Sequence, residues 1–70
     1  MNPVGTYHIQ LEGQLIADEI NTTSPLHLTL ERIEAAAALF SVCTDQSGLI
    51  GLLRHLHSRG YKILSIYRER

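Results

Sequence analysis

The stretch TDQSGLIGLLRHLHSRGYKILSIYR, residues 44–68, predicts one helix followed by one strand and decides the fold. Its leucines recur at the i, i+3, i+4, i+7 spacing that places side chains on one face of an α-helix. They are Leu49, Leu52, Leu53 and Leu56. Because burial of each leucine contributes about 1.5–3 kcal/mol, this face is expected to supply most of the core.

The signals at each end place the helix at residues 45–59. Asp45 can accept hydrogen bonds from the free N–H groups of the first turn, and Ser47 is a second candidate for this cap. Gly60 stands where helices commonly end in a left-handed residue.

The segment that follows the helix predicts a strand with apolar residues on both faces, which is typical of a central strand. Tyr61, Ile63 and Tyr67 share one face, and Leu64 and Ile66 share the other. If Leu64 and Ile66 meet the helix, the first three residues lie on an uncovered sheet face. Tyr61, Ile63 and Tyr67 are therefore the predicted interface.

The N-terminal half predicts one further strand with clear bounds. Residues 7–12 alternate apolar and polar side chains, which indicates one buried face, and Gly13 ends the run. Residues 1–6 are expected to form a flexible tail. Residues 14–20 allow at most a short helical turn, and residues 21–25 are expected to form a loop.

Residues 26–44 allow two interpretations. Alternation at residues 26–31, followed by the β-favouring Phe40, predicts a hairpin that turns near residues 32–34. The alanines at 35–38 have high helix propensity and favour a helix instead. We prefer the hairpin because tertiary context commonly overrides propensity.

The expected element order is strand, short turn, strand, strand, helix, strand. It defines a single two-layer α+β domain over residues 1–70, with a four-stranded, mainly antiparallel sheet and one long helix on one face. The other face is left for solvent or for another subunit. Because 70 residues support only a small core, we expect a homo-oligomer, most simply a dimer.

Composition fits a folded, soluble protein, with 44% hydrophobic and 19% charged residues. The chain shows neither a secretory signal nor an apolar run of membrane-spanning length, so we expect a cytoplasmic protein with no membrane partner. The single cysteine, Cys43, excludes an internal disulfide and a multi-thiolate metal site, and its apolar neighbours predict a core position. No cofactor is expected.

Charge is distributed unevenly along the chain. Residues 1–53 hold one base against six acids, net −5, and residues 54–70 hold five bases against one acid, net +4. The five bases are Arg54, Arg59, Lys62, Arg68 and Arg70. They can meet RNA, an acidic partner or the acidic half of a second copy, or simply be solvated. The absence of an aromatic-rich RNA motif speaks against a nucleic-acid partner.

The helix-strand unit resembles the C-terminal half of a family of very small, uncharacterised bacterial proteins. The resemblance rests on DQSGLIGLL at residues 45–53, then Gly60 and ILSI at residues 63–66, with Tyr-x-Ile-x-x-x-Gly at residues 7–13 matching the family's beginning. It implies a hairpin directly before the helix, although residues 35–38 are alanines where turn-forming glycine and threonine are expected. It implies no activity.

The same unit is similar to the front half of an ACT domain, a ligand-sensing module with a ferredoxin-like fold. In that module a strand leads into Asp-x-x-Gly-Leu, a helix, a glycine and an Ile-x-Ser-Ile strand, which residues 45–66 match. The resemblance implies a site for a small anionic metabolite at Gln46, Ser47 and Gly48, between paired subunits. The ordinary alternative is that Asp45 only caps the helix.

The two alternating strands carry polar side chains on the face turned away from the core. They are His8, Gln10 and Glu12 in the first strand and His27, Thr29 and Glu31 in the second. If the strands are neighbours, their histidines and glutamates provide ligands that Zn²⁺ accepts. Solvated strand residues are the ordinary alternative, because no tight ligand spacing is present.

No catalytic residue is predicted, since the sequence contains no nucleophile elbow, phosphate-binding loop or paired-acid motif. The leading hypothesis is a small interaction or regulatory protein that self-associates through the uncovered sheet face or an exposed edge. A different protein partner also fits this hypothesis. The alternatives are ACT-like metabolite binding and weak RNA binding by the basic C-terminal segment.

Overall fold

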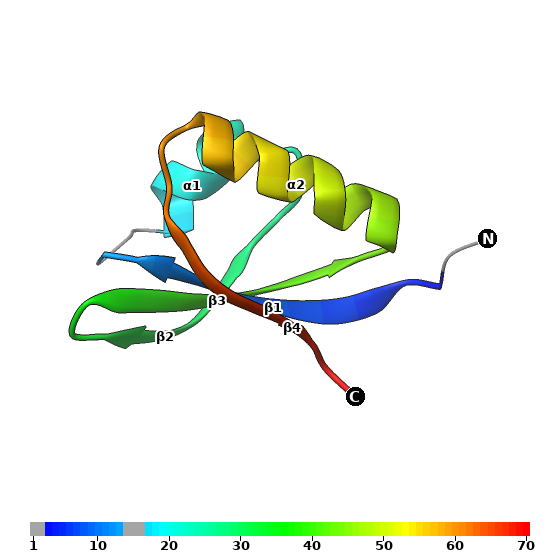
Figure 1. The fold of residues 1–70 in the computed structure, drawn as a ribbon, viewed down its shortest axis with the longest axis horizontal. Coiled ribbons are helices and arrows are strands. Elements are labelled where there is room, and N and C mark those ends of the chain that lie inside the picture. The colour runs from blue at the N-terminus through cyan, green and yellow to red at the C-terminus, as the bar shows by residue number, and fades with distance from the viewer. Residues whose placement is uncertain (1–2, 14–16) are drawn as a thin grey trace.

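The structure, a computed structural model, describes residues 3–13 and 17–70. Its elements in chain order are β1 (Gly5–Glu12), α1 (Ala17–Thr23), β2 (Thr29–Glu34), β3 (Ala37–Thr44), α2 (Gln46–Ser58) and β4 (Ile63–Arg68). The strands form one antiparallel sheet in the order β2-β3-β1-β4. Both helices lie on the same side of this sheet (Figure 1). The predicted α+β fold, with one main helix over a four-stranded antiparallel sheet, is confirmed.

Helix α2 has the bounds and the buried face that the sequence predicts. Asp45 is the N-cap residue and Arg59 the C-cap residue. Gly60 then adopts a positive φ of 87°, which residues with a Cβ rarely adopt. Leu49, Leu52 and Leu56 are buried, and Leu53 packs against the same cluster.

The core lies between this leucine face and the two central strands. Strands β1 and β3 supply alternate residues, including Ile9, Leu11, Phe40 and Val42, to the same buried cluster. The alternation predicted for residues 7–12 is therefore confirmed, because Tyr7, Ile9 and Leu11 all point inward. Ile20 of α1 and Leu28, just before β2, belong to the same buried cluster.

The hairpin interpretation of residues 26–44 is confirmed, and the helical alternative is wrong. Strands β2 and β3 pair antiparallel, and the turn between them falls at Ala35 and Ala36 rather than at residues 32–34. Ala38 is fully buried opposite Leu11. A small side chain at this central position is compatible with close packing of the helices against the sheet. Tertiary packing therefore overrides the helix propensity of the alanines.

Two N-terminal boundaries differ from their predictions. Strand β1 begins at Gly5, so the predicted flexible tail is too long by two residues. Met1 and Asn2 of that tail lie outside the described residues, as do residues 14–16 of the predicted turn. Helix α1 extends to Thr23, where a loop was predicted. Asn21 fixes this helix because its amide donates to the Leu28 carbonyl at 2.8 Å and accepts from the Leu28 N–H at 2.7 Å.

The prediction that the last strand is central is wrong, because β4 pairs with β1 alone and forms one edge of the sheet. The register shifts between Gln10 and Leu11, so that Ile63 lies opposite Leu11 and Ser65 opposite Gln10, with Leu64 as the extra residue. This bulge changes the alternation within β4. Apolar residues at both parities therefore reflect the bulge and not burial on two faces.

Cys43 is exposed, contrary to the predicted core position. It lies on β3 between Val42 and Thr44, which are both buried. Since successive strand residues point to opposite faces, Cys43 points to the face without helices. The apolar residues that precede it, Phe40 and Val42, point to the other face of the same strand.

Replacing Leu52 with alanine should lower the free energy of unfolding by about 2–5 kcal/mol, because the Leu52 side chain, on the inner face of α2, is fully buried. Ile50 lies on the same helix but is 48% exposed, so Ile50→Ala should change it by no more than about 0.5 kcal/mol. Urea unfolding followed by circular dichroism measures both variants. Equal losses would contradict the assignment of the buried face.

Candidate functional site

The N-terminus of α2, the predicted ligand site, is closed by the chain's own side chains. The Asp45 carboxylate accepts a hydrogen bond from the Gly48 N–H at 2.8 Å. Gln46 and Ser47 are exposed. At Gly48 a Cβ would clash with the Thr44 hydroxyl oxygen, so a larger residue there would require the Thr44 side chain to move.

This arrangement is the geometry of a helix cap. The free N–H groups and the dipole of a helix N-terminus favour an anion, and here the Asp45 carboxylate already occupies that position. An anionic metabolite would meet a like charge at this point. Ligand binding by Gln46, Ser47 and Gly48 stays a prediction.

The three predicted interface residues do not share one face. Tyr61 and Ile63 pack against the core cluster, whereas Tyr67 is 52% exposed and stacks on His8 on the opposite face, with ring centroids 4.8 Å apart. The assumption of a common open face is wrong because the bulge at Leu64 separates Ile63 from Tyr67. Of the three, only Tyr67 is exposed on the face without helices.

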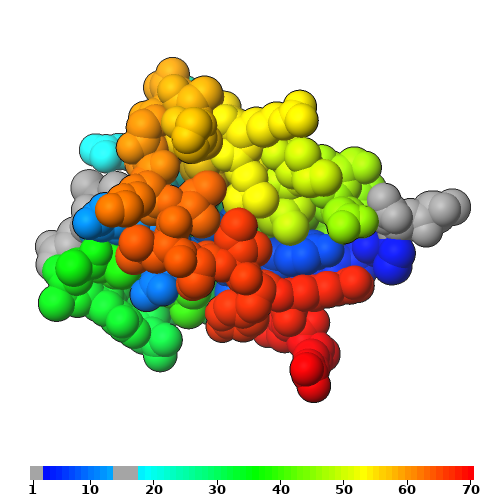
Figure 2. Space-filling model, viewed as in Figure 1, coloured from blue at the N-terminus to red at the C-terminus, as the bar shows by residue number. Residues whose placement is uncertain are grey.

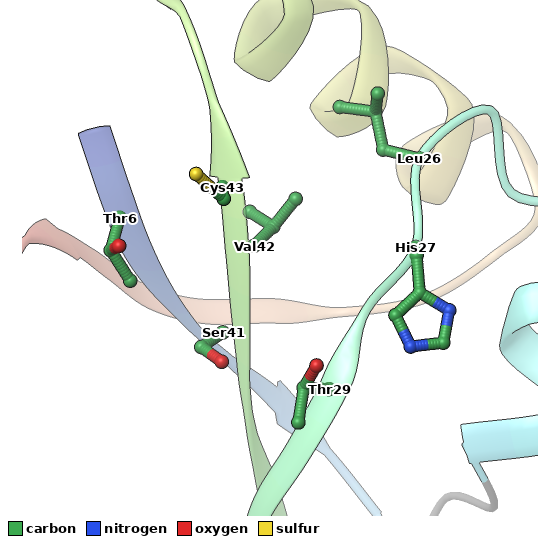
Figure 3. Close-up of a pocket in the computed structure, with 7 residues that line it drawn as sticks. All are labelled: Thr6, Leu26, His27, Thr29, Ser41, Val42 and Cys43. Carbon is green, nitrogen blue, oxygen red and sulfur yellow. The ribbon is translucent and has the colours of Figure 1, made fainter. Parts of the chain in front are cut away.

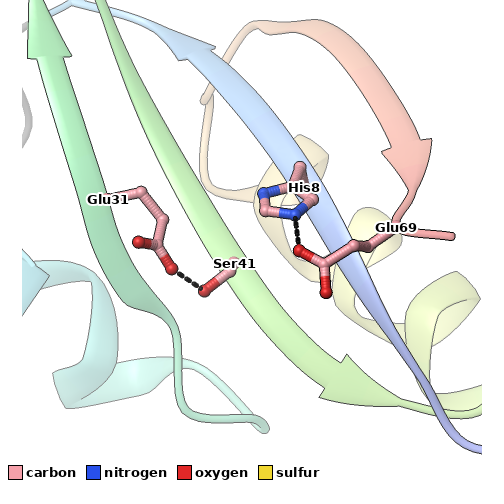
Figure 4. Close-up of polar contacts among 4 residues, drawn as sticks. All are labelled: His8, Glu31, Ser41 and Glu69. Carbon is pink, nitrogen blue, oxygen red and sulfur yellow. Dashed lines mark hydrogen bonds and ion pairs between the residues drawn. The ribbon is translucent and has the colours of Figure 1, made fainter.

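The polar side chains proposed to converge on a metal are kept apart by β3, which lies between β1 and β2. His8 Nε2 is 3.0 Å from Glu69 Oε1, and the Ser41 hydroxyl donates to Glu31 Oε1 at 2.6 Å (Figure 4). Glu12 faces Lys62 at 3.7 Å. Across residues 3–13 and 17–70, no group of three or more His, Cys, Asp or Glu could hold a metal ion. The described residues therefore do not show the convergence of histidines and glutamates that this hypothesis assumes.

Serine, histidine and glutamate also lie along one row of the sheet, since Ser41 pairs with His8 across β3 and β1. A nucleophilic serine needs its hydroxyl directed to the base. Here the Ser41 hydroxyl donates to Glu31, on the far side from His8 (Figure 4). His8 Nδ1 is buried without a hydrogen-bond partner. The row therefore fixes neighbouring strands to one another and does not activate the serine.

Two of the basic residues that were candidates for RNA binding interact instead with other side chains of the same chain. The Arg68 guanidinium lies over the Tyr7 ring, 5.8 Å from its centroid, in a cation–π contact. Lys62 faces Glu12. Arg54 and Arg59 are exposed on α2 and at its C-cap. These contacts use part of the basic charge within the fold.

A pocket of ≈ 330 Å³ opens where β2 separates from β3. The last β2–β3 pair is Thr29 with Ser41, although β3 continues to Thr44. The pocket is lined by Thr6, Leu26, His27, Thr29, Ser41, Val42 and Cys43. The His27 ring and the Cys43 sulfur point in different directions within it (Figure 3). Their orientation does not pair a thiol with a base.

The two edges of the sheet differ in chemistry. Strand β2, TLERIE, carries three charged residues and a register shift between Leu30 and Arg32, and such features hinder pairing with another strand. Strand β4, ILSIYR, has Arg68 as its one charged residue. Its exposed apolar side chains are Leu64 at 46%, Ile66 at 39% and Tyr67 at 52%. The outer edge of β4 is therefore the candidate functional site.

The candidate site lies fully on the surface. Figure 2 shows β4, in orange to red, running across the front of the molecule with no other segment over it. Sequence reasoning selected Tyr67 but placed Leu64 and Ile66 under the helix. Their exposure follows from the position of β4 at the edge, and no local signal in the segment indicates that position, since apolar residues at both parities favour a central strand.

No family model matches the chain, and no curated protein or solved structure matches it either. The resemblances to the small bacterial family and to the ACT domain thus remain predictions. Among the described residues, no helix has the length and apolar character needed to cross a membrane.

Replacing Asp45 with alanine should lower the free energy of unfolding by about 1 kcal/mol, because the cap on α2 is lost. Asp45→Ser should retain most of the stability, since serine also caps. Ser47→Ala is the control, because Ser47 is exposed and Asp45 makes the cap. Thermal and urea unfolding measure the three variants, and a larger loss at Ser47 would contradict this assignment of the cap.

Proposed function

We propose that this chain is a small, non-catalytic interaction module that self-associates through the outer edge of β4. The observation that carries the proposal is an unpaired edge strand with exposed Leu64, Ile66 and Tyr67. An edge strand presents a row of free N–H and C=O groups to which another strand can pair. A second copy is the partner proposed.

The size of the chain supports self-association. A domain of 70 residues buries a small fraction of its surface and commonly gains stability from oligomerisation. The uncovered sheet face is the less suitable surface, because His8, Gln10, Ser41 and Cys43 make it largely polar. The edge offers both apolar contact and backbone hydrogen bonds.

The contacts within the chain weigh against the two alternatives. The Asp45 carboxylate at the start of α2 disfavours a small anionic metabolite. The contact of Arg68 with Tyr7 and of Lys62 with Glu12 reduces the free basic charge for RNA. We also propose a cytoplasmic setting, since a reducing compartment would keep the exposed thiol of Cys43 unpaired.

Light scattering during size-exclusion chromatography should show a dimer at high micromolar concentration. Ile66→Lys should weaken that dimer at least about tenfold, which corresponds to 1.4 kcal/mol, because a lysine on an edge disfavours strand pairing. Ile33→Lys is the matched control: Ile33 is 52% exposed on the opposite edge strand, and its replacement should leave the dimer intact.

Circular dichroism must show that both lysine variants fold. A wild-type protein that stays monomeric at high micromolar concentration would overturn the proposal. Loss of the dimer in Ile33→Lys alone would move the interface to β2.

A further inference from the structure

We infer that two copies pair β4 with β4 in antiparallel register about a two-fold axis at Ile66, joining their sheets into one continuous sheet. The inference rests on the proposed function and assigns the partner, the register and the contacts at the β4 edge. Because the axis is perpendicular to the sheet, the helices of both copies would lie on the same face. The surface opposite them would stay polar.

The hydrogen bonds to β1 determine which backbone groups of β4 are free. The Glu69 N–H donates to the Thr6 carbonyl at 2.8 Å. Tyr67, two residues before Glu69, pairs with His8. In an antiparallel ladder, successive residues direct their N–H and C=O groups to alternate sides. Ile66 and Arg68 therefore direct theirs away from β1, to the open edge.

This alternation restricts how two copies can meet. Free groups of one copy must lie opposite free groups of the other, so one residue of β4 has to lie on the two-fold axis. An axis between two residues would bring a free group against one already bonded to β1. The candidates are Ser65, Ile66 and Tyr67, at the middle of the strand.

Side-chain faces separate the three candidates. With Ser65 on the axis, Tyr67 would lie opposite Ile63, although the bulge puts these two on different faces. With Tyr67 on the axis, only residues 66–68 of β4 would pair with the partner's β4, because β4 ends at Arg68. With Ile66 on the axis, residues 64–68 pair: Ile66 meets the partner's Ile66, the large Tyr67 meets the small Ser65 on the same face, and Arg68 lies opposite Leu64. The longer paired segment and these cross-strand pairs favour this last register.

Charge at the two ends of the paired strands is compatible with this register. Glu69 would lie opposite the partner's Ile63, one residue from the partner's Lys62; Glu69 and Ile63 are on different faces, but this pair lies beyond the end of β4 at Arg68. Lys62 already reaches Glu12 on the face where Glu69 contacts His8. Arg70 would lie opposite the partner's Lys62, a pair of like charges beyond the end of β4 at Arg68. Glu69 lies beside this pair and offsets part of its repulsion.

Disulfide trapping tests the register. In a Cys43→Ser background, single cysteines are placed at Ser65, Ile66 and Tyr67 and the proteins are oxidised under conditions where the wild type is a dimer. Ile66→Cys should form a covalent dimer, because residues that face each other across the axis have Cα atoms about 5.5 Å apart. Ser65→Cys and Tyr67→Cys should not, because a two-residue offset of about 6.8 Å along the strand exceeds disulfide reach.

Hydrogen exchange in the unmodified protein provides a second measurement that needs no variant. The Ile66 and Arg68 amides should exchange more slowly as the protein concentration rises through dimer formation. The Tyr67 amide should be protected at every concentration, because it is bonded to β1 within one chain.

Each result separates the register from the proposed function. Cross-linking at Ser65 or Tyr67 in place of Ile66 would overturn the register while self-association through β4 stands. A dimer by light scattering with no concentration-dependent protection at Ile66 would overturn β4 pairing itself. A monomer at all concentrations would overturn both.

Discussion

The leucine face of α2 is the contact on which the rest of the structure depends. Leu49, Leu52 and Leu56 are buried against the two central strands. In a chain of 70 residues no other segment of the described residues brings as many leucines to the core. This one helix can cover only a limited width of sheet, and β1 and β3 take the positions beneath it. Strand β4 is consequently left at the edge.

The position of β4 explains why its apolar residues are exposed. The bulge at Leu64 leaves Ile63 and Ile66 opposite the buried Leu11 and Ile9. Ile63 packs against the core, whereas Ile66 is 39% exposed at the edge and Tyr67 lies on the other face. His8 holds the end of this strand through a stack on Tyr67 and a contact with Glu69. The result is an ordered strand with a free outer edge, which is the form that strand pairing requires.

The candidate site could be predicted only in part. The parity of Tyr67 predicts its exposure, but parity indicates a face only where alternation is regular, and a bulge cannot be read from ILSIYR itself. The proposed metal ligands, such as His8 and Glu31, depended on β1 and β2 being neighbours. The strand order places β3 between them. Pairing between distant segments is a tertiary property, because each strand offers the same backbone groups to any neighbour.

The sequence by itself determined the local structure: the bounds of α2 from Asp45 to Gly60, its leucine face, and the inward residues of β1. These follow from periodicity and capping within a few residues. Only the tertiary structure decided that the alanines at 35–38 turn and pair as strands, that Cys43 is exposed, and that β4 is an edge. Those outcomes depend on which faces the core covers, and the core assembles from residues far apart in the chain.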